Sequence, residues 1–271
     1  MAKLKKQIRN TPPFKIIQSV QRATDILNCF TDTSYHLTLN EISDLVDLNV
    51  NTTRGLVNTL VYNGVLSHNK QYNTYSLGLY FLTKTNIIQK QMESYVASAK
   101  PLVDDLAEKY HISASMQLAN QRKIYSIYCA YPSNTAYTIG LSEYGALPLY
   151  ATSSGKLLSL YNLYLQDEEN LNYIDFHKYT DKTITSKQEF IKQLLIVQEN
   201  HYAYEMEEFA LGVGSLAVPI LDRDEKLICT VSATFFASYF PTIKDNLLID
   251  LRKIADVISK KLFTNTELPL F

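Results

Sequence analysis

Two short amphipathic segments, separated by only a few residues, constrain the fold of this chain more than any other feature of its sequence. In the first, "TLNEISDLVDL", Thr38 and the glutamate three residues later form a capping-box pattern ahead of apolar residues at helical spacing. In the second, "NVNTTRGLVNTLVYNG", Asn49 or Asn51 is a suitable cap and Asn63-Gly64 is a typical helix end. Two helices joined by so short a turn predict a helix-turn-helix.

The flanking segments extend this pattern on both sides. Residues 19–30 carry apolar side chains at helical spacing, and Ser19 fits the N-cap position. Between residues 65 and 77, a polar turn separates two short apolar segments, which predicts a two-stranded hairpin. We therefore expect a winged helix-turn-helix domain over residues 1–82.

The exposed side of the second helix of this motif is polar. Asn51, Thr52, Arg54 and Asn58 carry groups that hydrogen-bond to base edges and phosphates, although a merely solvated face fits the same pattern. Gly55 lies among them, and a glycine in a helix interior costs about 1 kcal/mol relative to alanine. Its presence indicates either a close approach of the backbone to a phosphate or a tolerated weakness.

The charge distribution favours a polyanionic partner for the first third of the chain. The whole chain has a net charge of −1, but residues 1–90 hold ten Lys and Arg against five Asp and Glu. We expect His68 and Lys70, in the hairpin, to contact phosphate. A basic N-terminal arm could follow phosphates or remain a solvated terminus, and it comprises Lys3, Lys5, Lys6, Arg9 and Lys15.

The rest of the chain predicts an α+β domain with an antiparallel sheet. We expect a connector helix over residues 83–100, a break at Pro101 and a second helix up to about residue 110. Period-two alternation then predicts strands at 114–119, 123–131, 136–141, 202–206, 214–221 and 227–235. Further helices are expected from Thr152, from Ser186 with a second capping box, and over residues 242–263.

The sequence offers no set of residues that makes a case for an enzyme. A phosphate-binding loop fails at Gly155-Lys156, because no glycine lies five residues before that glycine and no Ser or Thr follows the lysine. A helix starting near Thr152 could still hold an anion at its free N–H groups. The acidic run Glu205, Glu207 and Glu208 is typical of a charged strand edge. We expect no catalytic residues, no metal and no cofactor.

Cysteine usage and hydropathy indicate a cytoplasmic protein. The three cysteines, Cys29, Cys129 and Cys229, lie far apart in apolar surroundings, which favours buried thiols over disulfides. No apolar run approaches the ~20 residues of a membrane span, and the basic start lacks the apolar stretch of a secretion signal.

Several segments, in the same order and spacing, resemble the IclR family of bacterial transcriptional regulators. "SVQRATDILNCF" is similar to the opening helix of that family, and "LTLNEISDLVDLNVNTTRGLVNTLVYNGVLS" to its second and third helices. "YNTYSLG" resembles the end of its wing, and "LPLYATSSGKLLSLY" a strand-to-helix motif. The block from "TITSKQEF" to "CTVSAT" resembles the most diagnostic part of the family.

The resemblance implies a winged helix-turn-helix joined by a connector helix to a GAF-like, antiparallel-sheet effector domain, here residues 101–271. It also implies homodimers or homotetramers that bind double-stranded operator DNA and a small effector, often an organic acid or aromatic metabolite. The effector-binding residues carried over by position are Ser153, Ser154, Glu205, Ser215, Ser232 and Thr234.

This chain departs from the family pattern at several positions. Gly55 stands where an arginine is common, and Gln198 and His201 replace a usual Arg and Gly. Phe235-Phe236 replace a common Gly-Pro. Glu205 often corresponds to an aspartate, and the extra methylene of glutamate would narrow the implied effector pocket. These departures bear on the operator sequence and on the effector.

The leading hypothesis is a ligand-responsive DNA-binding transcriptional regulator, acting as a repressor. The alternative is a small-molecule-converting enzyme that uses the winged helix only for dimerisation. A third interpretation is an adaptor whose winged helix contacts proteins; the basic balance of residues 1–90 counts against it.

Overall fold

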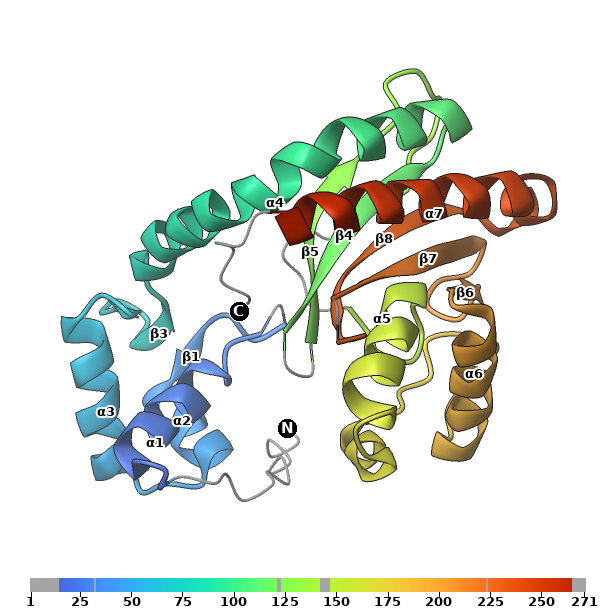
Figure 1. Ribbon diagram of the computed structural model, residues 1–271. Coiled ribbons are helices and arrows are strands. Elements are labelled where there is room, and N and C mark those ends of the chain that lie inside the picture. The colour runs from blue at the N-terminus through green and yellow to red at the C-terminus, as the bar shows by residue number, and fades with distance from the viewer. Residues whose placement is uncertain (1–14, 32, 121–122, 142–146, 223, 265–271) are drawn as a thin grey trace. The chain divides into compact units, whose positions relative to one another are not determined.

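The computed structural model describes residues 15–31, 33–120, 123–141, 147–222 and 224–264 (Figure 1). Contacts within the chain divide it into two compact units, Met1–Gln91 and Met92–Phe271. The division falls inside the segment predicted to be a connector. Within the described residues, no helix is both long and apolar enough to cross a membrane.

The first unit has the helices and the hairpin of a winged helix-turn-helix. Its elements are α1 (Gln18–Leu27), β1 (Leu37–Thr38), α2 (Leu39–Val46), α3 (Val50–Tyr62), β2 (Leu66–Asn69) and β3 (Thr74–Leu77). The hairpin is the predicted one, and the unpredicted strand β1 pairs with β3, giving the sheet order β1-β3-β2. The apolar stripes of the helices meet in one core around Ile26, Ile42 and Val57.

Capping interactions define the two helices of the motif. Thr38 Oγ1 accepts a hydrogen bond from the Glu41 N–H, and the Glu41 carboxylate accepts one from the Thr38 N–H, which confirms the capping box. Asn49 caps α3 by accepting from the Thr52 N–H at 2.8 Å. The prediction for Ser19 is wrong, because α1 begins at Gln18 and has no side-chain cap. A helix start at the surface can leave its N–H groups to water.

Helix α4 (Tyr80–Tyr110) contradicts the predicted break at Pro101, because it is continuous through that residue. An interior proline removes one helical hydrogen bond and costs about 3 kcal/mol. Pro101 is itself exposed, while Ala99 and Val103 on either side of it are completely buried in the core of the second unit. We infer that packing of this part of α4 outweighs the local penalty.

The second unit is built on a five-stranded antiparallel sheet with the order β5-β4-β8-β7-β6. Its strands are β4 (Ser113–Asn120), β5 (Lys123–Ala130), β6 (Ala203–Met206), β7 (Val213–Leu221) and β8 (Leu227–Phe236). The predicted strand at 136–141 is absent, because residues 131–141 are irregular. Side chains hold this segment instead: Ser113 Oγ donates to the Ile139 carbonyl, and the Leu141 N–H donates to Tyr131 Oη.

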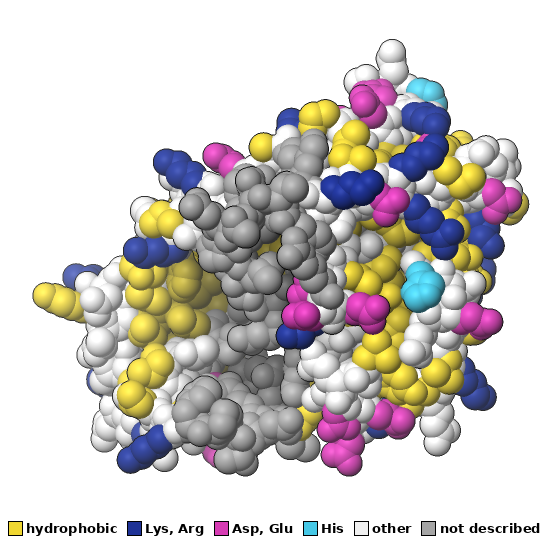
Figure 2. Space-filling model, viewed as in Figure 1, with side chains coloured by type: hydrophobic (Ala, Val, Ile, Leu, Met, Phe, Trp, Pro, Cys, Tyr) yellow, Lys and Arg dark blue, Asp and Glu magenta, His cyan; other side chains and the backbone are white. Residues whose placement is uncertain are grey.

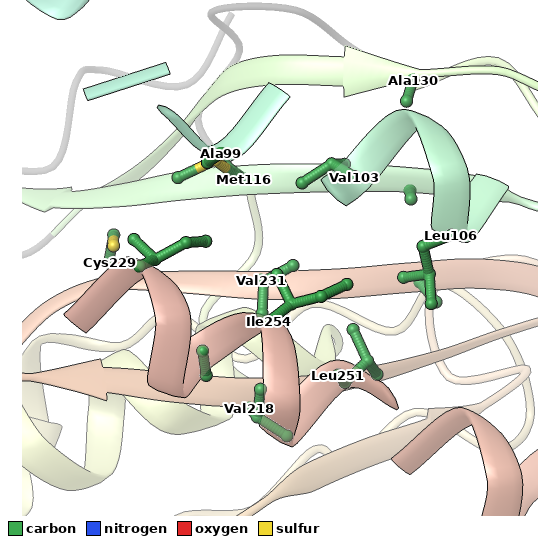
Figure 3. Packing of buried hydrophobic residues seen from close by; sticks show 14 of the residues in the cluster. Ala99, Val103, Leu106, Met116, Ala130, Val218, Cys229, Val231, Leu251 and Ile254 are labelled. Atoms are coloured by element: carbon green, nitrogen blue, oxygen red, sulfur yellow. The ribbon is translucent and has the colours of Figure 1, made fainter. Parts of the chain in front are cut away.

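Helices cover both faces of this sheet (Figure 1). The second part of α4 and α7 (Phe240–Thr264) lie on one face, where Met116, Val218 and Val231 pack with Val103 and Leu251 (Figure 3). Helix α5 (Ser153–Leu158), which continues as the π-helix Ser159–Tyr164, and α6 (Lys187–Asn200) lie on the other. The two faces differ in chemistry, and the α5 face carries the candidate site of this unit.

Candidate functional site

The polar face of α3 is open to solvent. Thr53 and Val57 anchor the helix in the core, so the helical period turns Asn51, Arg54 and Asn58 outward, and all three are exposed. Thr52 is half-buried and uses its N–H in the helix cap. The face therefore presents a guanidinium and two carboxamides, which are the groups that recognise guanine and adenine edges in a major groove.

Gly55 lies in the same exposed face and meets no packing constraint within the first unit. Apart from its two chain neighbours and the nearby backbone of its own helix, a Cβ atom at this position has no heavy atom within 4 Å. Packing against the rest of the unit therefore gives no reason for a glycine here.

The hairpin presents one of its two predicted phosphate contacts more openly than the other. Lys70 is exposed at the tip, whereas the ring of His68 stacks on Tyr75 with centroids 4.5 Å apart. His68 Nε2 also shares a hydrogen bond with Asn73 Oδ1 at 3.2 Å. Of the predicted basic arm, Lys15 is exposed, and Lys3, Lys5, Lys6 and Arg9 lie outside the described residues.

The α5 face of the large sheet carries a strip of polar side chains within the core. Directly paired residues of antiparallel strands share a face, and here Ser115 pairs with Ser232, Gln117 with Thr230, and Ser215 with both Glu205 and Thr234. We call this set the polar strip; its members are Ser113, Ser115, Gln117, Glu205, Ser215, Thr230, Ser232 and Thr234. All are buried except Thr234, which is half-buried.

One end of the polar strip connects α5 to a buried carboxyl group. The N–H and the hydroxyl of Ser153 donate to Ser215 Oγ at 3.3 and 2.9 Å. Ser215 Oγ donates to Glu205 Oε1 at 3.1 Å, and the Glu208 N–H donates to Glu205 Oε2 at 2.9 Å. Glu205 is only 3% exposed, and this burial raises its pKa to about 7. Protonated and ionised forms are therefore both accessible near neutral pH.

A buried ion pair lies beside this carboxyl group. Lys156 Nζ contacts Glu208 Oε1 at 2.6 Å and donates to the Tyr204 carbonyl at 3.1 Å, with the lysine side chain only 1% exposed. Burial raises the pKa of Glu208 despite the lysine. The interpretation of the acidic run as a charged strand edge is therefore wrong for Glu205 and Glu208. Glu207 lies just after β6, half-buried, and pairs with the exposed Lys182.

The N–H groups in the first turn of α5 are not all free, contrary to the expectation from the sequence. Thr152 Oγ1 accepts from the Gly155 N–H at 3.1 Å, and the Ser153 N–H is bonded to Ser215. An anion at the Ser153 or Gly155 N–H would therefore have to displace an existing partner.

The other end of the strip includes residues that the sequence analysis missed. Gln117 and Thr230 join Ser154 and Ser232, two of the predicted effector contacts, in one hydrogen-bond network. The alternation of polar residues in "SASMQ" and "TVSAT" was the available signal, since period two inside apolar strands places polar groups on one face. Lys156 was considered only for a phosphate loop, so its buried role was missed too.

Charges on the surface of the second unit are of mixed sign. Figure 2 shows basic and acidic side chains side by side over α7. Lys109 and Lys253 both contact Asp250 there. Among the described residues, no group of three or more His, Cys, Asp or Glu side chains is placed to hold a metal ion.

A winged helix-turn-helix with an open polar helix face, together with an α+β unit holding a buried polar strip, defines a two-domain DNA-binding regulator. The sequence matches the family profile "IclR helix-turn-helix domain" over residues 19–70 and "Bacterial transcriptional regulator IclR C-terminal" over residues 90–260. The chain therefore belongs to the IclR family of bacterial transcriptional regulators, and its winged helix is the DNA-binding domain of that family.

Relatives and solved structures agree with this assignment. The HTH-type transcriptional regulator XynR of Escherichia coli K12 is 25% identical over 224 residues, covering 82% of this chain and 88% of XynR. A putative IclR regulator from Silicibacter sp. TM1040 has the same fold, with a TM-score of 0.78, 20% identity and coverage of 90% and 96%. An IclR homolog from Microbacterium hydrocarbonoxydans, solved with 4-hydroxybenzoate, gives a TM-score of 0.67 with 18% identity and coverage of 91% and 100%.

Proposed function

We propose that this regulator represses transcription at an operator and releases or repositions DNA when a small organic or aromatic acid binds its second unit. The observation that carries the proposal is the polar strip, in which buried hydroxyls lead from α5 to Glu205. Core positions are ordinarily apolar, and a concave apolar region with few convergent polar groups is typical of a ligand site.

The proposed effector contacts are the six residues Ser153, Ser154, Glu205, Ser215, Ser232 and Thr234. An ionised Glu205 would repel a carboxylate, but the pKa of about 7 allows the protonated form to donate a hydrogen bond to it. Binding of an acid would then take up a proton. The complex of the Microbacterium homolog with 4-hydroxybenzoate supports an acid as the ligand class.

We propose that Asn51, Arg54 and Asn58 contact base edges. Thr52 and Gly55 would lie near the sugar-phosphate backbone of the DNA, and Lys70 would contact a phosphate. His68 would orient the hairpin through its stacking on Tyr75. We propose a homodimer or homotetramer, because paired recognition helices read two half-sites of an operator. Helix α4 belongs to both units, which suits it to transmit a change between them. We propose no catalytic activity.

A mobility-shift titration tests the proposal. DNA from upstream of the gene for this protein should bind, with affinity that falls as salt rises, and an effective acid should weaken the complex. Removal of the protein should increase transcription if it is a repressor. Binding that is independent of salt would exclude phosphate contacts, and turnover of an acid by the purified protein would favour the enzyme alternative.

A further inference from the structure

The side chain of Gln117 occupies the middle of the polar strip, and its amide is bonded at both ends. Nε2 donates to Ser115 Oγ at 2.6 Å and to Ser232 Oγ at 3.0 Å. Oε1 accepts from Thr230 Oγ1 at 2.8 Å and from Ser154 Oγ at 3.0 Å. Gln117 is 3% exposed, so its carboxamide is a buried hub that connects β4, β8 and α5.

This hub divides the polar strip into two parts. In the inner part, Gln117 engages the hydroxyls of Ser154, Ser232 and Thr230. In the outer part, the hydroxyls of Ser153 and Ser215 lead to Glu205 without involving the amide. The hydroxyls of Ser154 and Ser232 are therefore already engaged by the carboxamide, and a ligand group that bonds to them has to replace it.

We propose that Gln117 is a specificity-determining residue that sets the maximum length of the effector by filling the inner part of the strip. The inference rests on the proposed effector site. This proposal narrows the six proposed contacts. The acid is held in the outer part, at Ser153, Ser215 and Glu205, while Ser154 and Ser232 remain bonded to Gln117. A longer acid is rejected because its chain has to displace an amide whose hydrogen bonds it cannot reproduce.

The chemistry of a carboxamide suits this role. An amide offers two donors and an acceptor with two lone pairs, so it can satisfy hydroxyls on both sides at once. A hydrocarbon chain placed there instead would remove the hydrogen bonds that Ser154 and Thr230 donate to the amide and leave these two buried hydroxyls bonded only to each other, which is unfavourable. The barrier to longer ligands is therefore both steric and polar.

Two substitutions distinguish the effect of the side-chain volume of Gln117 from the effect of its hydrogen bonds. Gln117→Ala removes the carboxamide and opens the inner part, whereas Gln117→Met fills about the same volume without hydrogen bonds. Gln117→Asn is a milder truncation that keeps an amide, in case the alanine variant does not fold. Met116→Ala is the matched control, because Met116 is equally buried but packs in the core on the α4 and α7 face.

The probes are straight-chain carboxylates of increasing length from acetate to octanoate, with benzoate and 4-hydroxybenzoate. Thermal shift and calorimetry measure their binding to the full-length protein. We expect wild type and Met116→Ala to share one cut-off length, and Gln117→Met to lie between wild type and Gln117→Ala, because methionine keeps the steric part of the barrier and loses the polar part. Gln117→Ala should bind acids beyond that cut-off at least about tenfold more tightly than wild type, since one methylene in a pocket is worth that much or more.

Two outcomes would overturn the size limit alone. One is that wild type and Gln117→Ala bind acids beyond the cut-off equally tightly. The other is that Gln117→Met or Met116→Ala gains as much affinity for these acids as Gln117→Ala does. If no acid binds wild type or any variant while DNA binding is intact, the proposed acid-sensing function itself fails. The size limit then falls with it.

Discussion

The exposed face of α3 and the polar strip of the large sheet are both rich in polar side chains. The polar groups on α3 face water, whereas those of the strip are hydrogen-bonded to other protein groups. On α3, Asn51, Arg54 and Asn58 project into solvent. At the strip, Ser153 of α5 donates to Ser215, and Ser215 donates to Glu205, inside the core. The first surface is ready for a rigid partner, whereas the second must exchange internal hydrogen bonds for those of a ligand.

The difference has an energetic consequence. A polar group exposed to water loses little when it is deleted, so substitutions on α3 should affect binding far more than stability. A buried polar group left without its partner costs the full desolvation penalty, so substitutions in the strip should affect both.

The largest effect is expected at the buried ion pair beside Glu205. Lys156→Met leaves the carboxylate of Glu208 in the core without its cation and should lower the free energy of unfolding by about 3–5 kcal/mol. Urea denaturation followed by circular dichroism measures this change.

The chain offers a matched control for that measurement. Lys182 pairs with the neighbouring Glu207, but its side chain is 57% exposed, so Lys182→Met should cost no more than about 1 kcal/mol. Equal losses for the two variants would mean that burial of the Lys156 pair has no energetic importance.

Glu205 should make stability depend on pH near neutrality. Burial raises its pKa from 4.5 to about 7, so the folded chain holds more protons than the unfolded chain between these values. The free energy of unfolding therefore decreases as pH rises from about 4.5 to 7, by up to about 3 kcal/mol, and the loss remains above pH 7.

Neighbouring groups also shift the pKa of Glu205, and a variant shows that the pH dependence comes from this residue. Glu208 raises its pKa further, while Lys156, the Ser215 hydroxyl and the Glu208 N–H oppose the rise. Glu205→Gln removes the titration, so the difference between wild-type and variant unfolding free energies should follow that curve. A difference that does not change with pH would show that Glu205 titrates at its ordinary value.

On α3, Arg54→Ala should weaken specific DNA binding by about tenfold to a hundredfold with little change in stability, because a bidentate contact to a base is worth about 1–3 kcal/mol. Arg54→Lys keeps the positive charge but not the planar guanidinium that can donate two parallel hydrogen bonds to one base. Failure of lysine to restore affinity in a mobility shift supports base recognition, and full restoration would reduce Arg54 to a phosphate contact.

Gly55→Ala should separate stability from binding. Because the added Cβ meets no heavy atom within 4 Å beyond its chain neighbours and its own helix backbone, the helix should gain about 1 kcal/mol of stability. If the backbone at Gly55 lies close to a phosphate, the same methyl group weakens DNA binding. A variant that is stabilised and binds DNA as tightly as wild type would show that Gly55 is only a tolerated weakness.

The first unit could be predicted closely because its signals are local. The capping box at Thr38, the cap at Asn49 and the helix end at Asn63-Gly64 involve residues within one turn of each other. The misplaced N-cap at Ser19 and the unpredicted strand β1 are small errors. The first arises where α1 starts without a side-chain cap, and the second where pairing with β3 decides the structure.

The second unit was predicted in its strands, apart from the absent strand at 136–141, but not in its interior. The register of β4, β7 and β8 puts Gln117, Ser215 and Thr230 on one face, and residues so far apart in sequence become neighbours only through strand pairing. Helix α4 continues through Pro101 for a related reason, since burial of Ala99 and Val103 outweighs a local rule.

The sequence by itself determined the order of elements, the winged helix, the polar face of α3 and the family resemblance, because periodicity and capping act over a few residues. Only the tertiary structure decided that Glu205 is buried, that the half-buried Glu208 pairs with the buried Lys156, and that Gln117 occupies the middle of the polar strip. Those properties depend on desolvation and on hydrogen bonds between distant strands, and neither is present until the sheet and α5 have packed together.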